Sequence, residues 1–360
     1  MKAAVCYEYG KPLVVEEVNL DPPQQGEVKV RLAATAVCHS DIHTIRGEIR
    51  FPLPFVAGHE SAGYVEEVGE GVTSVKPGDN VIVSLVISCG KCLYCKTGLS
   101  HLCEAKWPID TEGRLHAKQG QPLKQLFRTA TFAEYAIVHQ SQAVPIPKDM
   151  PMDRAALLGC GVITGFGAVV NRVQVKALKS VVVIGTGGVG LNAVQGAAFV
   201  GATPVIAVDV SDYKLEAARS FGATHTVNAG RENAVDAVKQ LTSGRGADYV
   251  FVTVGSTAAI QEGFAMSAPR STTVIVGIPS VNDNDLTLPA FNFIRSERVL
   301  TGGFMGSVCL SEDIPKLVKL YQAGQLKLDE LITGRYKLEQ INEAIASVEK
   351  GEALRNIITF

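Results

Sequence analysis

The sequence has no run of basic residues, no long uninterrupted apolar segment and no large excess of one charge. Its 360 residues include 34 basic and 36 acidic side chains, for a net charge of -2. Proteins that bind nucleic acid or anionic membranes usually present a basic face, so this balance argues against both partners. The longest apolar stretch, residues 155–170, is interrupted by glycines and by Thr164, which makes it a poor membrane span.

The first residues also lack the apolar core of a secretory signal peptide. We therefore expect a cytoplasmic protein, in a reducing compartment where clustered cysteines bind metal more often than they form disulfides. The sequence has no internal repeat and no low-complexity segment. Hydrophobic residues make up 46% of the chain, enough for large cores, and the length favours two domains.

The pattern of apolar residues changes along the chain. Residues 1–150 are rich in strand patterns, such as the alternation in "EVKVRLAATAVC". From Ser180 onward, six short apolar segments alternate with helical patterns, which predicts a doubly wound parallel sheet. One helix is expected to begin after Ser211 and to stop at Gly222. Two amphipathic helices within residues 301–360 are expected to return to the first domain.

A glycine-rich turn follows the first of these apolar segments. Its G-x-G-x-x-G pattern lies between a strand and a helix, where the glycines permit a tight turn, close approach of a pyrophosphate and close helix–strand packing. Asp209 ends the next strand, where an acid is expected to bind the adenosine ribose. A purely structural turn in another α/β protein is the weaker alternative. The predicted NAD site comprises Gly185, Gly187, Gly188, Val189, Gly190, Asp209 and Lys214.

Half of the eight cysteines stand together in the segment "SCGKCLYCKTGLSHLC". This cysteine quartet consists of Cys89, Cys92, Cys95 and Cys103. Its C-x2-C-x2-C-x7-C spacing favours a bound metal. An iron–sulfur cluster is less well matched, because the fourth cysteine follows after seven residues rather than three and no proline comes next.

The quartet and the pattern Gly58-His59-Glu60-x2-Gly63-x5-Gly69 resemble those of zinc-dependent medium-chain alcohol dehydrogenases, in particular the liver-like and class III-like branch. The resemblance covers essentially the whole chain. It implies a β-rich, GroES-like catalytic domain over residues 1–161, with a zinc lobe at 89–103. It also implies an NAD-binding Rossmann domain over 162–300 and a C-terminal segment, 301–360, that returns to the catalytic domain.

The resemblance implies two zinc ions per chain. Cys38, His59 and Cys160 match the three ligands of the catalytic zinc, and the quartet matches the structural site. Two thiolates and an imidazole leave a fourth zinc position for substrate, whereas four thiolates close the tetrahedron. Asp41 matches the carboxylate that steadies the ligand histidine. Glu60 matches an acidic neighbour that approaches the metal transiently.

The same resemblance implies a proton relay and further cofactor contacts. Ser40 and His43 match the hydroxyl and the imidazole that carry the proton of the alcohol to solvent. His39 and Arg355 match basic residues near the cofactor pyrophosphate.

The implied activity is reversible hydride transfer between an alcohol and NAD, which gives an aldehyde or a ketone. Apolar pocket residues suit an apolar alcohol better than a sugar. Leu85 stands where an aromatic residue often narrows the pocket, which leaves room for benzylic or allylic alcohols. A long segment after Cys103 is typical of dimeric members, so we expect a homodimer, with a tetramer as the alternative. The expected pocket residues are Leu85, Ile49, Leu126, Phe127 and Ile278.

The main alternative is a thiol-adduct formaldehyde dehydrogenase of the same superfamily, which acts on S-hydroxymethyl-thiols. His39 resembles that branch, but Trp107 stands where its glutathione-dependent members carry an anion-binding arginine. Polyol and threonine dehydrogenases usually have glutamate in place of Cys160. A nucleic-acid-binding zinc module is disfavoured by the absence of a basic face. A zinc-free quinone or enoyl reductase relative would not need Cys38, His59 and Cys160 together.

Overall fold

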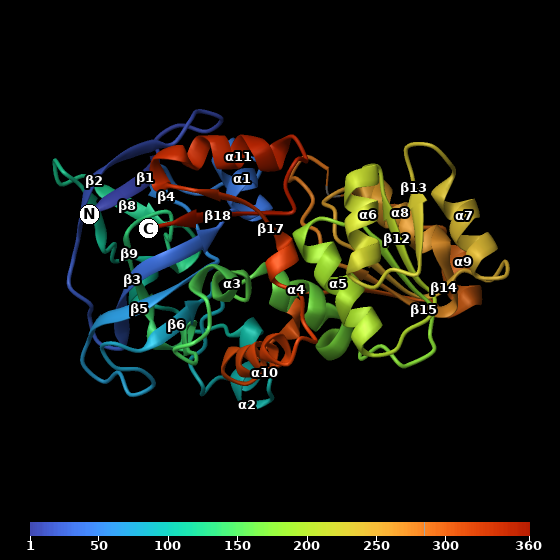
Figure 1. The fold of residues 1–360 in the computed structure, drawn as a ribbon, viewed down its shortest axis with the longest axis horizontal. Coiled ribbons are helices and arrows are strands. Elements are labelled where there is room, and N and C mark those ends of the chain that lie inside the picture. Colours follow the sequence, from blue (N-terminus) through green and yellow to red (C-terminus); the bar gives the residue numbers. More distant parts are fainter. Residues whose placement is uncertain (284) are drawn as a thin grey trace. The chain divides into compact units, whose positions relative to one another are not determined.

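The computed structural model describes residues 1–283 and 285–360, and these fall into two compact units. Unit 1 comprises Met1–Gly161 and Cys309–Phe360, and unit 2 comprises Val162–Val308 (Figure 1). From the sequence, the chain was expected to return to the first domain at residue 301. The structure places it at Cys309, because Val299–Gly302 is a strand of the sheet in unit 2.

Unit 1 contains a closed barrel. Its apolar interior includes Phe55 and Phe132, both completely buried, and helix α11 packs its apolar face on the same core through Ile341 and Ile345. Burial of side chains of this size contributes about 1.5–3 kcal/mol each. In order around the barrel, the strands are β1 (Lys2–Cys6), β2 (Val14–Leu20), β7 (Leu115–Ala117), β8 (Pro122–Gln125) and β4 (Phe55–Val56).

A second sheet of unit 1 joins segments from both ends of the chain. The C-terminal strand β18 pairs antiparallel with β3, with Ile357 opposite Ala36. β9 (Tyr135–His139) also pairs with β3. Apart from β9, the strand order of this sheet is β10 (Ala143–Pro145), β6 (Asn80–Val83), β5 (Ser61–Val68), β3 (Glu27–Ala36), β18 (Arg355–Thr359) and β17 (Ile332–Tyr336).

Short helices of unit 1 flank these sheets and carry several candidate site residues. Helix α1 follows β3 directly and begins immediately after Cys38. The helices of this unit are α1 (His39–Arg46), α2 (Leu93–Lys96), α3 (Met152–Leu157), α10 (Leu310–Gln322) and α11 (Ile341–Glu349). Helix α4 (Gly161–Gly167) begins at the last residue of the first segment and continues in unit 2.

Unit 2 is a parallel sheet with helices on both of its faces (Figure 1). All six apolar segments recognised in the sequence form strands. Numbered within the unit, their order is 3-2-1-4-5-6, which is the Rossmann arrangement. The strand order is β13 (His225–Asn228), β12 (Val205–Asp209), β11 (Val181–Ile184), β14 (Ala247–Val252), β15 (Ser267–Ile275) and β16 (Val299–Gly302).

The helices of unit 2 follow their sequence signals. Ser211 caps α6 by accepting a hydrogen bond from the N–H of Lys214, and the chain turns at Gly222 with a φ of +110°. Val238 of α7 and Ile260 of α8 pack against the sheet in one apolar cluster. These helices are α5 (Gly188–Phe199), α6 (Asp212–Ser220), α7 (Ala234–Leu241), α8 (Thr257–Met266) and α9 (Ala290–Ser296).

Among the described residues, we find no helix that combines the length and the apolar character needed to cross a bilayer.

Candidate active site and metal centres

The fold of unit 1 brings three distant residues into one buried cluster. Cys38 stands between β3 and α1, His59 lies between β4 and β5, and Cys160 precedes α4. Their ligand atoms lie within 4.8 Å of one another, and the Nε2 of His59 is 3.2 Å from the Sγ of Cys160. Two ligands of one tetrahedral zinc ion lie about 3.5–3.8 Å apart, so these donors are close to the spacing that zinc requires.

Asp41 holds the imidazole of His59 in place. Its Oδ1 accepts the N–H of Gly58 at 2.9 Å and lies 3.0 Å from the Nδ1 of His59. The bond to Nδ1 turns Nε2 toward the two cysteines, as expected for a carboxylate that orients a metal ligand. Gly58 has a φ of +95°, and a Cβ there would lie 2.6 Å from the ring of Phe132. The local backbone at this position therefore requires glycine.

Charges are concentrated in this buried cluster. The hydrogen bond from Cys160 and the charge of His59 lower the pKa of Cys38, although burial opposes the change. Burial also opposes charging of His59, but the charges of Asp41 and Cys38 raise its pKa. The cluster can thus hold a thiolate away from water, and the thiolate is the form of cysteine that binds metal.

Glu60 and Arg355 form a buried ion pair beside the cluster. The N–H of Gly161 donates to the Oε1 of Glu60 at 3.1 Å. Burial raises the pKa of Glu60 to about 7, against the opposing charge of Arg355. Arg355 comes from β18 and is only 4% exposed, so in unit 1 its charge is directed at Glu60. The expected contact of Arg355 with a pyrophosphate stays a prediction.

Helix α1 carries the residues expected to move a proton. The Oγ of Ser40 lies 3.9 Å from the Sγ of Cys38. His43 lies one turn further along and is partly exposed, and its Nδ1 contacts the carboxylate of Glu48. His39 is exposed, with its ring centroid 6.3 Å from that of His43. Glu48 was not among the residues predicted from the sequence, although Gly47 before it signals the end of the helix.

The expected pocket residues differ in their surroundings. The ring of Phe127 packs edge-on against His59, with centroids 5.0 Å apart and planes at 78°. Phe127 has a φ of 53°, in the left-handed region that bulky residues rarely adopt and that is often found at functional sites. Leu126 lies in the barrel core at 1% exposure. Leu85 and Ile49 are partly exposed in unit 1, whereas Ile278 belongs to unit 2 and is 49% exposed.

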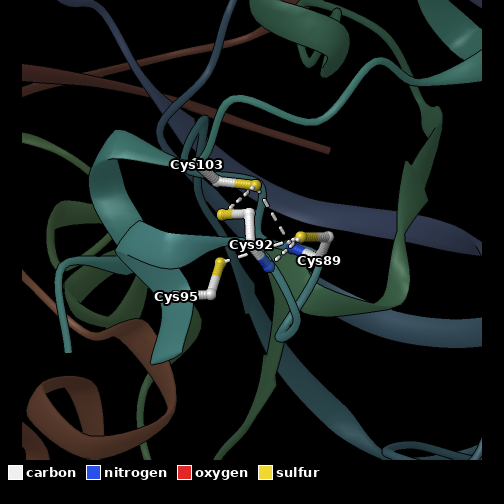
Figure 2. A group of neighbouring side chains, drawn as sticks. All are labelled: Cys89, Cys92, Cys95 and Cys103. Carbon is white, nitrogen blue, oxygen red and sulfur yellow. Dashed lines mark hydrogen bonds between the residues drawn. The ribbon is translucent and has the colours of Figure 1, made fainter. Parts of the chain in front are cut away.

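The cysteine quartet forms a second, local cluster. Figure 2 shows the four sulfur atoms facing one another, with Cys89 and Cys95 4.0 Å apart and Cys92 and Cys103 3.9 Å apart. These separations approach the edge of a tetrahedron of thiolates around zinc, which is about 3.8 Å. Backbone hydrogen bonds from Lys91 and Cys92 lower the pKa of Cys89 to about 6.

The segment that carries the quartet has little core of its own. Helix α2 has no buried residue, and Leu93 on it is 68% exposed. Leu99 and Leu102 are 41% and 42% exposed. A metal held by the four sulfurs would therefore supply much of the cohesion of this segment.

The glycine turn of unit 2 has the geometry of a phosphate-binding loop. Gly185 has a φ of +85°, and a Cβ on Gly190 would lie 1.8 Å from the carbonyl oxygen of Gly185. A Cβ on Gly187 would meet no atom within 4 Å, so space remains beside this residue for a ligand. Gly188 and Val189 begin α5, whose first N–H groups favour an anion.

Asp209 ends β12 as expected, and its carboxylate is held by the glycine turn. The backbone N–H and the hydroxyl of Thr186 donate to its Oδ2 at 2.7 and 3.0 Å. The N–H groups of Val210 and Ser211 donate to its Oδ1. Lys214 is partly buried in the first turn of α6. Thr186 was not predicted from the sequence; its signal is a hydroxyl residue between the first two glycines of the turn.

Comparison with known proteins places the chain among related enzymes. Two family models match it, "Alcohol dehydrogenase GroES-like domain" over residues 24–148 and "Zinc-binding dehydrogenase" over residues 188–323. An NDMA-dependent alcohol dehydrogenase of Amycolatopsis methanolica is 40% identical over 365 residues, covering 99% of this chain and 98% of the relative. Alcohol dehydrogenase class-P of Arabidopsis thaliana is 37% identical over 371 residues, covering 100% and 97%.

A solved structure agrees with these sequence relatives. The benzyl alcohol dehydrogenase of Acinetobacter calcoaceticus superposes with a TM-score of 0.93 at 32% identity, covering 100% of this chain and 99% of that one. Both the sequence and the fold are therefore matched over the full length. The chain belongs to the zinc-dependent medium-chain alcohol dehydrogenase family.

Proposed function

We propose that this alcohol dehydrogenase depends on zinc and NAD and interconverts an apolar alcohol, benzylic or allylic, with its aldehyde or ketone. The observation that carries the proposal is the buried cluster of Cys38, His59 and Cys160. Three ligands of this kind leave a fourth position on zinc for a substrate oxygen. The cysteine quartet is proposed as the structural zinc site.

The residues of the chain have distinct roles in this proposal. When bound, zinc would polarise the alcohol oxygen as a Lewis acid, and NAD would accept the hydride. Asp41 orients His59, and Ser40, next to Cys38, accepts the proton of the alcohol. His43, which is partly exposed on the same helix, releases a proton to water.

The substrate proposal is based on the apolar side chains near the cluster. Phe127 beside His59 offers an aromatic edge to a ring or a double bond. The similarity to a benzyl alcohol dehydrogenase supports the same class of substrate. The thiol-adduct alternative is less well supported, because Trp107 packs on His139 at 4.4 Å and provides no charge for an anionic thiol.

A homodimer is proposed from the family resemblance and from exposed apolar residues of unit 2. Phe291 and Ile294 of α9 are 70% and 75% exposed, and Val299 of the outer strand β16 is 49% exposed. Packing of these residues against a second copy of the chain would remove them from water. Sedimentation equilibrium of the full chain should give twice the chain mass, and a single chain mass at micromolar concentration would contradict the proposal.

The substrate class can be tested by filling the pocket. Leu85→Phe should lower kcat/KM for benzylic alcohols by at least about tenfold while ethanol is affected less, because one added group in an apolar pocket changes binding by about 1–3 kcal/mol. Steady-state kinetics over primary, secondary, benzylic and allylic alcohols measures this. Leu178→Phe, at a site 79% exposed, is the control. A native preference for polyols, or a uniform loss in Leu85→Phe, would contradict the assignment.

Loss of one ligand should have different effects at the two metal clusters. Cys160→Ser should reduce turnover to background and lose one zinc while the fold persists. Cys95→Ser should lose the other zinc, expose the quartet segment to proteolysis near Lys96 and Lys106, and lower the melting temperature. A loss of about 2 kcal/mol corresponds to about 4–8 °C in a unit of this size. Zinc analysis, thermal melts and specific activity measure these outcomes.

Cys309→Ser is the matched control for both variants, because Cys309 is partly buried and belongs to neither cluster. It should keep both zinc ions and full activity. An active Cys160→Ser protein beside a folded but inactive Cys95→Ser protein would show that the two roles are reversed.

Cofactor preference should follow Asp209. A carboxylate there accepts the ribose 2′-OH and repels a 2′-phosphate, so the native protein should prefer NAD to NADP. Asp209→Gly should raise the ratio of kcat/KM for NADP to that for NAD by at least about tenfold, or 1.4 kcal/mol. Asp212→Asn, which removes a nearby exposed acid paired with Arg231, should leave the ratio unchanged. Equal use of both cofactors by the native protein would refute the assignment.

A further inference from the structure

Helix α1 ends in a turn that folds the chain back on His43. Gly47 adopts the left-handed conformation with a φ of 79°, and the N–H groups of Glu48 and Ile49 donate to the carbonyl of His43 at 2.9 and 3.2 Å. A Cβ on Gly47 would also lie 3.0 Å from the ring of Tyr9. Both the backbone conformation and the space therefore favour glycine here, and the turn brings the side chain of Glu48 beside His43.

The carboxylate of Glu48 contacts the Nδ1 of His43 directly. Both side chains are partly exposed, at 33% for His43 and 44% for Glu48. The loop that follows is fixed, since the N–H of Phe51 donates to the hydroxyl of Tyr9 at 3.0 Å. Glu48 is thus supported by a turn and a loop with defined hydrogen bonds.

The other charged groups around this helix have partners of their own. Arg46 donates to Glu349 of α11 through Nε at 2.7 Å and Nη2 at 2.6 Å. The guanidinium of Arg50 lies over the ring of Tyr9. The ring of His39, on the same helix, has its centroid 6.3 Å from that of His43. Among the described residues, Glu48 is the acidic side chain paired with His43.

We propose that Glu48 is a positioning residue for His43: it accepts the Nδ1–H and leaves Nε2 as the atom that takes up the relay proton. The hydrogen bond at one ring nitrogen of histidine determines the tautomer, and hence which nitrogen is basic. In the relay, a proton forms a bond to Nε2, the Nδ1–H bond stays intact, and water removes the proton from Nε2. No electron pair leaves the protein.

The arrangement parallels the buried pair formed by Asp41, on the same helix, and His59, between β4 and β5. Asp41 binds the Nδ1 of His59 and turns its Nε2 toward the metal ligands. Glu48 binds the Nδ1 of His43 and fixes the direction of its Nε2 in the same way. One helix and its terminal turn therefore set the orientation of two imidazoles, one for metal and one for protons.

The tautomer of His43 can be measured without reference to turnover. Nitrogen-15 NMR of the zinc-loaded protein at alkaline pH should show His43 with its proton on Nδ1. Glu48→Ala should convert it to a mixture of both tautomers, and Glu48→Gln, which keeps an acceptor oxygen, should restore part of the native signal. Glu349→Gln, which removes the acidic partner of Arg46, is the control and should leave the tautomer unchanged.

Kinetics test whether Glu48 assists proton transfer through His43, which depends on the proposed relay role of His43. Glu48→Ala should lower kcat for alcohol oxidation by about tenfold. This is the lower end of the loss that follows when a residue orienting a functional imidazole is removed. KM should change little, and added imidazole should restore part of the rate. The double variant His43→Gln/Glu48→Ala should be no slower than His43→Gln, because coupled residues act through one step.

The outcomes separate this inference from the function on which it depends. If His43→Gln does not slow oxidation, the relay role itself is wrong, whatever the tautomer. If His43→Gln slows oxidation while Glu48→Ala leaves both tautomer and rate unchanged, the role of Glu48 is wrong and the relay stands. An additive effect in the double variant would also overturn the proposal, because Glu48 would then act elsewhere.

Discussion

The hydrogen bond between Asp41 and His59 is the constraint on which the candidate active site depends. A fully buried carboxylate costs several kcal/mol unless hydrogen bonds or opposite charge stabilise it. Here the N–H of Gly58 and the imidazole of His59 stabilise Oδ1, whereas Oδ2 is buried without a hydrogen bond to the described residues. The bond ties α1 to the segment before β5 and thereby fixes the distance between Cys38 and His59. Gly58, whose N–H makes one of these bonds, adopts a φ of +95°.

The sequence predicted the alternating strands and helices of unit 2 well, because strand and helix patterns are local. The six strands of unit 2 and the cap at Ser211 follow from apolar runs and turn residues alone. The four cysteines of the quartet are also close in sequence, so their spacing was sufficient to predict that they form one cluster. Cys38, His59 and Cys160 come together only through β3, β5 and the start of α4, and family resemblance rather than local pattern pointed to them. The pairs His43–Glu48 and Thr186–Asp209 escaped notice, because each depends on a glycine turn whose geometry the sequence does not state.

The buried charges around the cluster come from both segments of unit 1. Asp41, His59 and Glu60 belong to the first segment, and Arg355 arrives on β18, near the other end of the chain. Glu60 is completely buried, and Arg355 is its ion-pair partner. The C-terminal strand thus completes the electrostatics of the site as well as the sheet. Local folding of the N-terminal segment alone would leave Glu60 without this partner.

The division of unit 1 by unit 2 sets an order of folding during synthesis. Residues 162–308 form one continuous unit and leave the ribosome as a block, so this unit can fold as soon as it emerges. Residues 1–161 emerge earlier but must wait for β17 and β18. In the meantime β9 already pairs with residues 27–31 of β3, while residues 34–36, which pair with β18, have no neighbour on that side. An open strand edge is a template for aggregation. The nascent chain is therefore exposed to misassociation at this edge from the emergence of β3 until β18 arrives.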